Sequence, residues 1–379
     1  AKARDVTKGA VTELDKIRAV GSFVQNLQYI SIDIGVGHGN GYKPRASDLV
    51  LNRGYGDCKD KANLMKAMLR SLGIDSYPVI IYSGDPTYVQ ASWVSPSQFN
   101  HCIIAVKISD DTKSPPVMDH PDLGRLLIFD ATDPYTPVGD LPDYLQGSQA
   151  LIVAGESGGL YKMPITEPEV DLLERIVKDS LDPSGSLSGT ISEKANGQTS
   201  STFRREVREL SVSDYRRAIE GWLTRGSTGA KLLDMASSDN EAKAQFALDI
   251  KFESPRYGQI MQNRLMIFKP VVVGRRNAVA LTEPKRKNPI ELDSVLMRES
   301  VEIKLPSGFE VDEMPDAVNL ESEFGRYVTN YEVKEGTLHF TRTYQLKRSL
   351  IPAEQYDAVK QFFAKMLDAE QSAVVLVRN

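Results

Sequence analysis

The pattern of apolar residues changes near residue 165, and this change constrains the fold more than any other feature of the chain. Before it, helix-spaced apolar stripes alternate with short strand-like runs. After it, most segments are strand-like and are separated by hairpin-turn residues. A chain of 379 residues is also too long for one ordinary core. We therefore predict an α+β protein of two domains, a mixed domain over residues 1–165 and a β-rich domain over residues 166–379.

The first domain is expected to pack helices against a sheet. Helices are predicted over 11–28, where apolar residues recur at helical spacing, and over 58–72, which Gly73 ends. The segments 83–99 and 109–124 are rich in polar, Pro and Gly residues and predict long loops, which in a compact domain are more often functional than idle. Strands are predicted over 77–82, 101–108 and 126–130.

The second domain is predicted to be an antiparallel sheet or sandwich. Turn residues at 182–185 and 196–197 separate extended stretches, and two helices, 213–224 and 353–369, offer apolar faces to the sheet. Apart from His339, which we interpret as structural, this half holds no Cys or His, so we expect a binding or packing role. The strands are predicted over 172–180, 186–194, 199–208, 246–254, 264–273, 299–305, 327–333 and 337–346.

Composition and charge exclude several classes of protein. The net charge is −5, from 46 basic and 51 acidic residues, which gives no reason to expect nucleic-acid binding. No apolar run approaches the ~18 residues that a transmembrane helix needs, and two cysteines cannot form a disulfide framework. The chain starts Ala-Lys-Ala without an initiator Met or a signal-like stretch, so we expect a fragment or a processed form.

Cys58 is the first candidate for a catalytic residue. It lies in the stretch Tyr-Gly-Asp-Cys-Lys-Asp-Lys at 55–61, where the second predicted helix begins. The unpaired N–H groups and the dipole of a helix N-terminus stabilise a thiolate and lower the pKa of a thiol. Lys59 and Lys61 would add to this effect, and the flanking aspartates would oppose it. The alternative is a small buried hydrophobe, the commoner role of a free cysteine.

His101 and Asp130 are the candidate partners of Cys58. A cysteine nucleophile needs an imidazole within hydrogen-bond reach, and the imidazole needs a third group that fixes its orientation. His101 begins one predicted strand and Asp130 ends another, so antiparallel pairing would bring them to one edge of the sheet. The alternative for Asp130 is a loop-start carboxylate. Cys102 alternates to the other face, which predicts a buried core thiol and argues against a disulfide with Cys58.

The other histidines of this half are weaker candidates. His38, a rival for the base, lies in the glycine-rich loop 35–41, which lacks the Gly-Lys-Ser/Thr of a phosphate loop and predicts a bent surface loop. His120 lies between Asp119 and Asp122 and could bind a metal ion, but no second histidine stands at ligand spacing. We therefore predict a surface loop there and no metal site.

These residues together resemble a known family. Residues 54–62, Gly-Tyr-Gly-Asp-Cys-Lys-Asp-Lys-Ala, running on to 69–74, are similar to the cysteine-helix block of the bacterial transglutaminase-like superfamily. Residues 99–103 (Phe-Asn-His-Cys-Ile) resemble its histidine block, and residues 127–133 (Leu-Ile-Phe-Asp-Ala-Thr-Asp) resemble its aspartate block. The blocks stand in the family's order and near its usual separations, and the resemblance covers roughly residues 10–160.

The resemblance implies a papain-like core in which Cys58 is the nucleophile, His101 the base and Asp130 the orienting carboxylate, with no metal or other cofactor. The half after residue 165 is similar to the β-rich module that often follows this core in bacterial members. Many such proteins are exported, so an extracytoplasmic location, periplasmic or secreted, is expected.

Two parts of such a site have only candidate residues. The backbone N–H of Cys58 could bind the oxyanion of the reaction together with a side chain, which is a Gln or Trp in relatives. Asn52 or a residue of the loop 36–42 is the candidate for that side chain. The aromatic candidates for the walls of the acyl-binding cleft are Tyr55, Trp93 and Tyr88, of which the last two could equally be ordinary loop anchors.

Three functions remain open. The first is a thiol-dependent hydrolase of a peptide or amide bond in a peptide or protein substrate, which we favour because water needs no dedicated site. The second is a transglutaminase that cross-links proteins, since the same acyl-thioester can react with an amine. The third is a catalytically silent scaffold whose second half binds a cell-envelope partner. The intact set of Cys58, His101 and Asp130 argues against the third.

Overall fold

The computed structural model describes residues 1–31, 41–278 and 281–379. The chain divides into two compact units, Ala1–Thr166 and Glu167–Asn379, and each has hydrophobic cores of its own. The glycine-rich loop with His38 lies outside the described residues, except at its end. None of the helices in the described ranges is long and apolar enough to cross a lipid bilayer.

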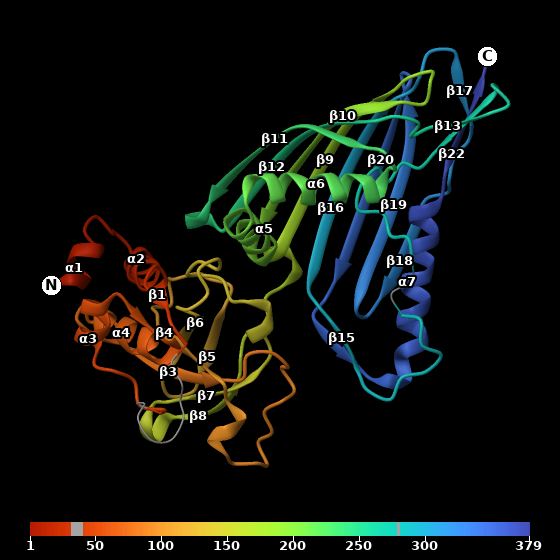
Figure 1. Ribbon diagram of the computed structural model, residues 1–379. Coiled ribbons are helices and arrows are strands. Elements are labelled where there is room, and N and C mark those ends of the chain that lie inside the picture. Colours follow the sequence, from red (N-terminus) through yellow and green to blue (C-terminus); the bar gives the residue numbers. More distant parts are fainter. Residues whose placement is uncertain (32–40, 279–280) are drawn as a thin grey trace. The chain divides into compact units, whose positions relative to one another are not determined.

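Unit 1 is built on a six-stranded antiparallel sheet with the strand order β5-β6-β4-β3-β7-β8 (Figure 1). Helices α2 and α4 share one core with the sheet, in which Ile17 and Val24 of α2 lie with Met65 and Leu69 of α4. The elements of this unit are α1 (Lys2–Val6), α2 (Glu13–Gln25), β1 (Gln28–Tyr29), α3 (Ser47–Arg53), β2 (Tyr55–Gly56), α4 (Cys58–Arg70), β3 (Ser76–Ile81), β4 (His101–Lys107), β5 (Val117–His120), β6 (Gly124–Phe129), β7 (Gln149–Ile152) and β8 (Gly159–Lys162).

Both long helices of unit 1 begin at residues that satisfy their first N–H groups. Thr12 and Asp15 form a capping box at α2, in which each side chain accepts the backbone N–H of the other over 3.1 Å. Asp57 is the N-cap of α4 and accepts the N–H of Asp60. These caps stop the helices from extending towards the N-terminus. The two predicted helices are confirmed, with somewhat shorter bounds.

The prediction of a surface loop at His120 is wrong. Residues 117–120 form β5, the terminal strand of the sheet, and the side chain of His120 is buried. Its Nδ1 accepts the N–H groups of Asp122 and Leu123 over 3.2 Å each, and its ring packs on Tyr161. The histidine therefore closes the turn that follows β5. A four-residue edge strand is too short to show periodicity in the sequence.

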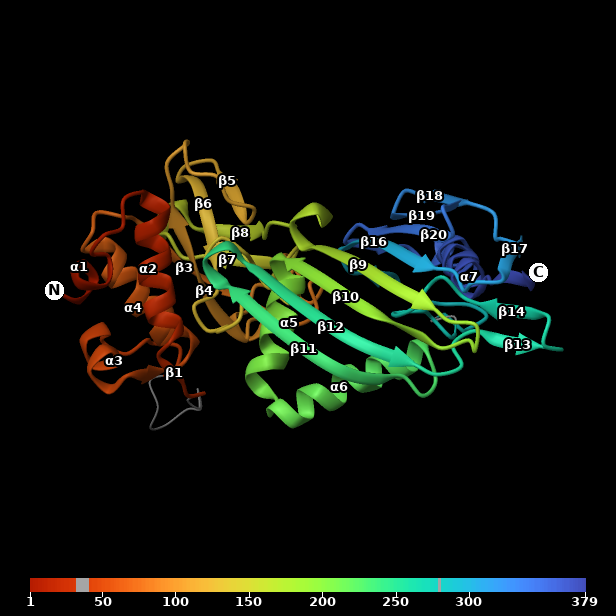
Figure 2. The same cartoon turned by 90° about the horizontal axis from the view of Figure 1, so that it is seen from above.

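Unit 2 is built on an eight-stranded sheet with the order β11-β12-β10-β9-β16-β20-β19-β18, antiparallel except where β9 and β16 run parallel (Figure 2). Phe340 packs in the same core as α6 and Tyr344 in the same core as α7. Since both residues lie on one side of β20, the two helices cover one face of the sheet. The strands are β9 (Leu172–Leu181), β10 (Leu187–Asn196), β11 (Lys231–Asn240), β12 (Gln245–Ser254), β16 (Val295–Lys304), β18 (Val318–Ser322), β19 (Gly325–Lys334) and β20 (Thr337–Leu346).

A smaller four-stranded sheet has the order β13-β14-β22-β17, and β15 pairs with β21. The strand predicted over 264–273 ends at Phe268, before Pro270. The remaining elements are α5 (Gly197–Glu209), α6 (Val212–Gly226), β13 (Gln259–Met261), β14 (Leu265–Phe268), β15 (Ile290–Leu292), β17 (Phe309–Glu313), β21 (Ser349–Ile351), α7 (Tyr356–Gln371) and β22 (Val374–Arg378).

The strand predicted over 199–208 is wrong, because this segment is the helix α5. Gly197 has a φ of +52° and starts the helix rather than a hairpin. The N–H of Gln198 donates to Asp171 Oδ1 over 2.8 Å, and Thr199 Oγ1 donates to the carbonyl of Asp171 over 2.8 Å. The buried side of α5 is small or polar and includes Arg204, which pairs with an aspartate of β11 over 2.8 Å. A helix with such a buried face shows no apolar stripe.

A row of buried charges crosses the centre of the eight-stranded sheet. Arg175 stands opposite Glu193 on one side and opposite Glu299 on the other, at distances of 2.6 and 3.0 Å. Arg342 stands opposite Glu299 on its other side, at 2.8 Å, and pairs with Glu370 of α7 at 2.9 Å. We call this row the charge ladder. Its members compensate one another in a region that excludes water.

Candidate active site

Cys58 is the first residue of α4, and the chain before it is held firmly. Gly54 adopts a left-handed conformation with a φ of +74° and ends α3. The following strand β2 runs parallel to β1, with the N–H of Gln28 donating to the Gly54 carbonyl over 3.0 Å and the N–H of Ile30 to the Gly56 carbonyl over 3.1 Å. The thiol therefore lies at the N-terminus of a 13-residue helix, where N–H groups and dipole favour negative charge.

His101 and Asp130 meet at the end of the paired strands β4 and β6. The register places Ile104 opposite Phe129, so the first residue of β4 lies beside the chain that leaves β6. His101 Nε2 lies 2.8 Å from Asp130 Oδ2, and both side chains are largely shielded from solvent, with 12% and 1% exposed. The juxtaposition expected from antiparallel pairing is thus present in the structure.

Cys58 lies close enough to the ring of His101 for its negative charge to raise the pKa of that ring, which completes a Cys–His–Asp arrangement. Burial disfavours the imidazolium, but the charge and hydrogen bond of Asp130 and the contact with Cys58 outweigh it and raise the pKa of His101 from 6.5 to about 10. Burial likewise opposes the charged form of Asp130, and the His101 cation overcomes this and lowers the pKa of Asp130. An imidazolium at His101 and a carboxylate at Asp130 can therefore exist together beside the side chain of Cys58.

Cys102 does not share in this arrangement. Burial raises the pKa of its thiol, and the negative charges of Cys58 and Asp130 raise the pKa further. Both cysteines are free, so no disulfide joins them. Cys102 thus remains a protonated thiol when Cys58 is a thiolate.

Lys61 is engaged away from the sulfur. Its Nζ donates to the carbonyls of Gln25 and Leu27 over 3.1 and 3.0 Å, and only 1% of the residue is exposed. Burial lowers its pKa to about 8, although the charge of Asp130 acts in the opposite direction. Lys59 pairs with Asp57. The two lysines expected to favour the thiolate are therefore used to fix the start of α4 and its contact with α2.

The candidate oxyanion and cleft residues differ in position and exposure. Asn52 is exposed on α3 and, within the described residues, makes no hydrogen bond to the Cys–His–Asp group. The loop 36–42 lies outside the described residues up to residue 40. Tyr55 lies half-buried on β2, two residues after Arg53 ends α3. Tyr88 and Trp93 are exposed in the connection between β3 and β4.

The connection between β3 and β4 is anchored beside His101. The register pairs Ile81 with His101, and Asn100 accepts the N–H of Ser83 over 2.7 Å while donating to the Ser83 carbonyl over 3.1 Å. Within the loop, the rings of Tyr82 and Tyr88 stack at 3.9 Å. The exposed aromatic side chains therefore belong to a loop whose two ends are fixed at the His101 end of the sheet.

Sequence reasoning missed two residues of the site. Thr132 donates from both its N–H and its Oγ1 to Asp130 Oδ1, over 2.8 and 2.6 Å. The order Asp-x-Thr could have indicated this turn. Tyr29 stands opposite Gly56 in the β1–β2 pair; burial and the nearby charges of Cys58 and Asp57 raise its pKa. No pattern in the sequence marks Tyr29, because its place depends on a two-residue strand pair.

No cluster of three or more His, Cys, Asp or Glu side chains suited to a metal ion occurs in the parts of the chain that the structure describes. His120 uses Nδ1 within its own turn, where it accepts the N–H groups of Asp122 and Leu123.

Comparisons with known proteins give matches to two family models, each over part of the chain. Residues 1–113 match the transglutaminase-like superfamily, and residues 263–376 match DUF3858, a domain of unknown function with solved structures. The chain thus carries an N-terminal core of the transglutaminase-like superfamily and a C-terminal DUF3858 domain. No curated protein matches the chain in sequence.

A solved structure shares the fold. It is a crystal structure from Parabacteroides distasonis ATCC 8503, described as that of a putative protease, with a TM-score of 0.55 and 12% sequence identity. The match covers 99% of this chain and 54% of the other, so this chain spans about half the length of that protein.

Proposed function

We propose that this protein is a thiol-dependent acyl-transfer enzyme that hydrolyses a peptide or amide bond. The observation that carries the proposal is the contact of Asp130 with His101 at 2.8 Å, together with the position of Cys58 at the start of α4, from which its charge acts on the pKa of His101. An oriented imidazole beside a helix-terminal thiol is the arrangement that generates a thiolate nucleophile. The description of the Parabacteroides protein as a putative protease supports a peptide bond as the target.

The reaction follows from the charges of the three groups. The Cys58 thiolate attacks the carbonyl carbon and forms a C–S bond. The His101 imidazolium then gives its proton to the leaving amine as the C–N bond breaks, which leaves an acyl-thioester and a neutral imidazole. Water attacks the thioester and gives a proton to His101, the C–S bond breaks, and the acid is released. Asp130 stays ionised and keeps the imidazole oriented.

The developing oxyanion requires donors, and two groups are candidates. One is the backbone N–H of Cys58, which is unpaired within the helix because it belongs to the first turn. The other is the hydroxyl of Tyr29, on β1 beside β2, whose pKa is raised by burial and by the nearby charge of Cys58, so that it keeps its proton. The aromatic loop between β3 and β4, with Tyr88 and Trp93 exposed, is proposed to contact the substrate.

The test uses a matched pair of cysteine variants. Wild type and Cys102→Ala are expected to react with a fluorescent iodoacetamide at neutral pH, and Cys58→Ala is expected not to react. Peptides and glutamine amides are then incubated with each protein, with and without a primary amine, and products are identified by mass spectrometry. We expect new carboxyl ends with wild type and Cys102→Ala alone.

Each alternative has its own outcome. Amide products formed with the added amine in place of free acids would reveal cross-linking chemistry. If Cys58 is labelled no faster than Cys102 and no substrate is turned over, the enzymatic function is rejected and the catalytically silent scaffold remains.

We also propose an extracytoplasmic location, on the resemblance to exported bacterial proteins. Fractionation of the native cells, followed by immunodetection of the protein, would test it. Recovery with the cytoplasmic fraction would reject this location.

A further inference from the structure

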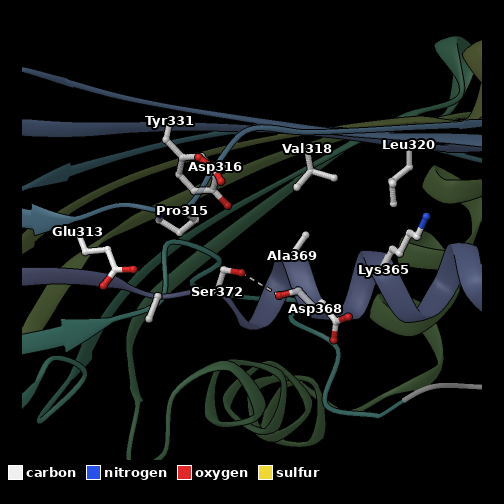
Figure 3. A pocket seen from close by; sticks show the side chains of 11 residues that line it. Glu313, Pro315, Asp316, Val318, Leu320, Tyr331, Lys365, Asp368, Ala369 and Ser372 are labelled. Atoms are coloured by element: carbon white, nitrogen blue, oxygen red, sulfur yellow. Dashed lines mark hydrogen bonds between the residues drawn. The ribbon is translucent and has the colours of Figure 1, made fainter.

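A groove in the β-rich unit lies between α7 and the edges of two sheets (Figure 3). Its volume is about 550 Å³. One side is formed by β18 and by Tyr331 of β19, and the other by the second half of α7 and the residues that follow it. The lining residues are Glu313, Pro315, Asp316, Val318, Leu320, Tyr331, Lys365, Asp368, Ala369, Ser372 and Ala373.

Part of the groove wall is apolar. In Figure 3 the side chains of Val318 and Leu320 point from β18 towards the helix, and Ala369 points from the helix towards the strand. Tyr331 adds an aromatic ring at one end. Such walls suit the aliphatic stem of a long side chain, and an aromatic ring also attracts a cation.

The rim of the groove is acidic. Glu313, Asp316 and Asp368 are all exposed, against a single base, Lys365, so the lining carries a net charge of −2. None of these three carboxylates makes an ion pair with a basic side chain of the described residues.

The charge extends along the chain that forms this rim. Residues 305–325, which include β17 and β18, contain six carboxylates and no Lys or Arg. The surface is therefore complementary to a positively charged ligand.

The groove also borders an unpaired strand edge. β18 is the last strand of the eight-stranded sheet, where it pairs with β19 alone among the described residues. An open edge of this kind offers backbone N–H and C=O groups to an added strand. A peptide bound there would place alternate side chains towards the groove.

We propose that this groove binds a lysine or arginine side chain of an extended peptide whose backbone pairs with the free edge of β18. The stem of the side chain packs between Val318, Leu320 and Ala369, and its cation lies among Asp316, Asp368 and Glu313. The site is distinct from the Cys–His–Asp group, and the proposal does not depend on the chain being an enzyme.

The test is carried out on the full chain carrying Cys58→Ala, so that no peptide can be cleaved. The probes are fluorescent peptides of about seven residues, a usual strand length, with a central Lys, Arg, norleucine or citrulline. A further probe carries proline beside the central Lys, which removes a backbone N–H needed for strand pairing. Binding is measured by fluorescence anisotropy between about 0.05 and 0.3 M NaCl.

The Lys and Arg peptides should bind about tenfold or more tightly than their neutral counterparts, and added salt should weaken them. The double variant Asp316→Asn/Asp368→Asn should reduce affinity by about tenfold. The control Asp312→Asn/Glu323→Gln removes two charges from the same segment and should leave affinity within about twofold, because neither side chain lines the groove.

Three results would overturn the proposal. Equal affinities for the Lys and norleucine peptides would show that the positive charge does not contribute to binding. Equal losses in the two double variants would show a diffuse field rather than a site. Unchanged binding of the proline peptide would exclude pairing with β18.

Discussion

Thr132 Oγ1 lies 2.6 Å from Asp130 Oδ1, the carboxylate oxygen that His101 does not use. The backbone N–H of Thr132 donates to the same oxygen over 2.8 Å. Asp130 is therefore held from one side by a turn and from the other by the imidazole. Because neither oxygen is free to rotate away, Thr132 is a positioning residue for His101.

The first prediction concerns Thr132→Val, which keeps the shape and removes the hydroxyl. A hydrogen bond to a charged group is worth ~1.5–3 kcal/mol, and the backbone donor remains, so we expect kcat for the hydrolysis to fall about tenfold. KM should change little, because Thr132 acts through Asp130 on the orientation of His101. Steady-state kinetics of Thr132→Val and of the control Thr132→Ser would measure this. If kcat falls as much in the serine variant as in the valine variant, loss of the hydroxyl does not cause the fall.

The second prediction concerns pH and stability. The pKa of His101 is raised from 6.5 to about 10, so its stabilising contribution is complete below pH 6.5 and is lost as the pH rises towards 10. The lowered pKa of Asp130 gives a contribution that is present above its usual value of 3.8 and is lost in acid. Urea unfolding should be measured for wild type and His101→Gln from acid solution to pH 10. The difference in their free energies of unfolding should be largest in slightly acidic solution. A difference in the free energy of unfolding that grows from pH 7 to 10 would contradict this prediction.

The third prediction separates the two partners of His101. Because the negative charge of Cys58 helps to raise the pKa of His101, Cys58→Ser should lower that pKa. Asp130→Asn should lower it more, since the Asp130 charge is the larger favourable contribution. NMR titration of the His101 ring in the two variants measures both shifts. An unchanged pKa in Cys58→Ser would mean that sulfur and ring do not interact in solution.

Much of this site could be inferred from the chain because Cys58, His101 and Asp130 each stand where a regular element begins or ends. Such positions follow from local periodicity and from the rule that antiparallel neighbours meet end to start. Thr132 and Tyr29 could not be predicted in the same way. The contact of Thr132 with Asp130 depends on a turn, and the position of Tyr29 depends on a two-residue strand pair. The role considered for Asn52 depended on sequence spacing alone, and the course of α3 leaves it exposed.

Some features of the fold escape prediction because periodicity counts buried polar groups as exposed. Arg204 on α5 is buried because it pairs with Asp239, so the segment lacked the apolar stripe of a helix. The charge ladder could not be predicted either. Arg175 and Glu299 lie in predicted strands, but their order along the chain does not show that they stand opposite each other. Pairing of this kind depends on register, which the sequence specifies only through the whole sheet.

The fourth prediction concerns Lys61, which ties the helix of the nucleophile to the end of α2. Lys61→Met retains the apolar stem but leaves the carbonyls of Gln25 and Leu27 without their donor. We expect the free energy of unfolding to fall by about 2 kcal/mol, since an unsatisfied buried polar group costs ~1–3 kcal/mol. Lys66→Met, on the same helix, is the control and should change it by less than about 0.5 kcal/mol. Equal effects in urea denaturation would show that the two hydrogen bonds contribute nothing.

The last prediction concerns the charge ladder of the β-rich unit. Arg342 is fully buried and lies between Glu299 and Glu370, so Arg342→Met leaves each carboxylate short of one partner. Breaking a buried ion pair costs ~3–5 kcal/mol, so we expect urea denaturation to show a loss of about 3 kcal/mol. Arg326→Met removes an exposed pair with Glu321 at 3.3 Å and should cost less than about 1 kcal/mol. Similar losses in the two variants would mean that the ladder gives this sheet no more stability than a solvated pair.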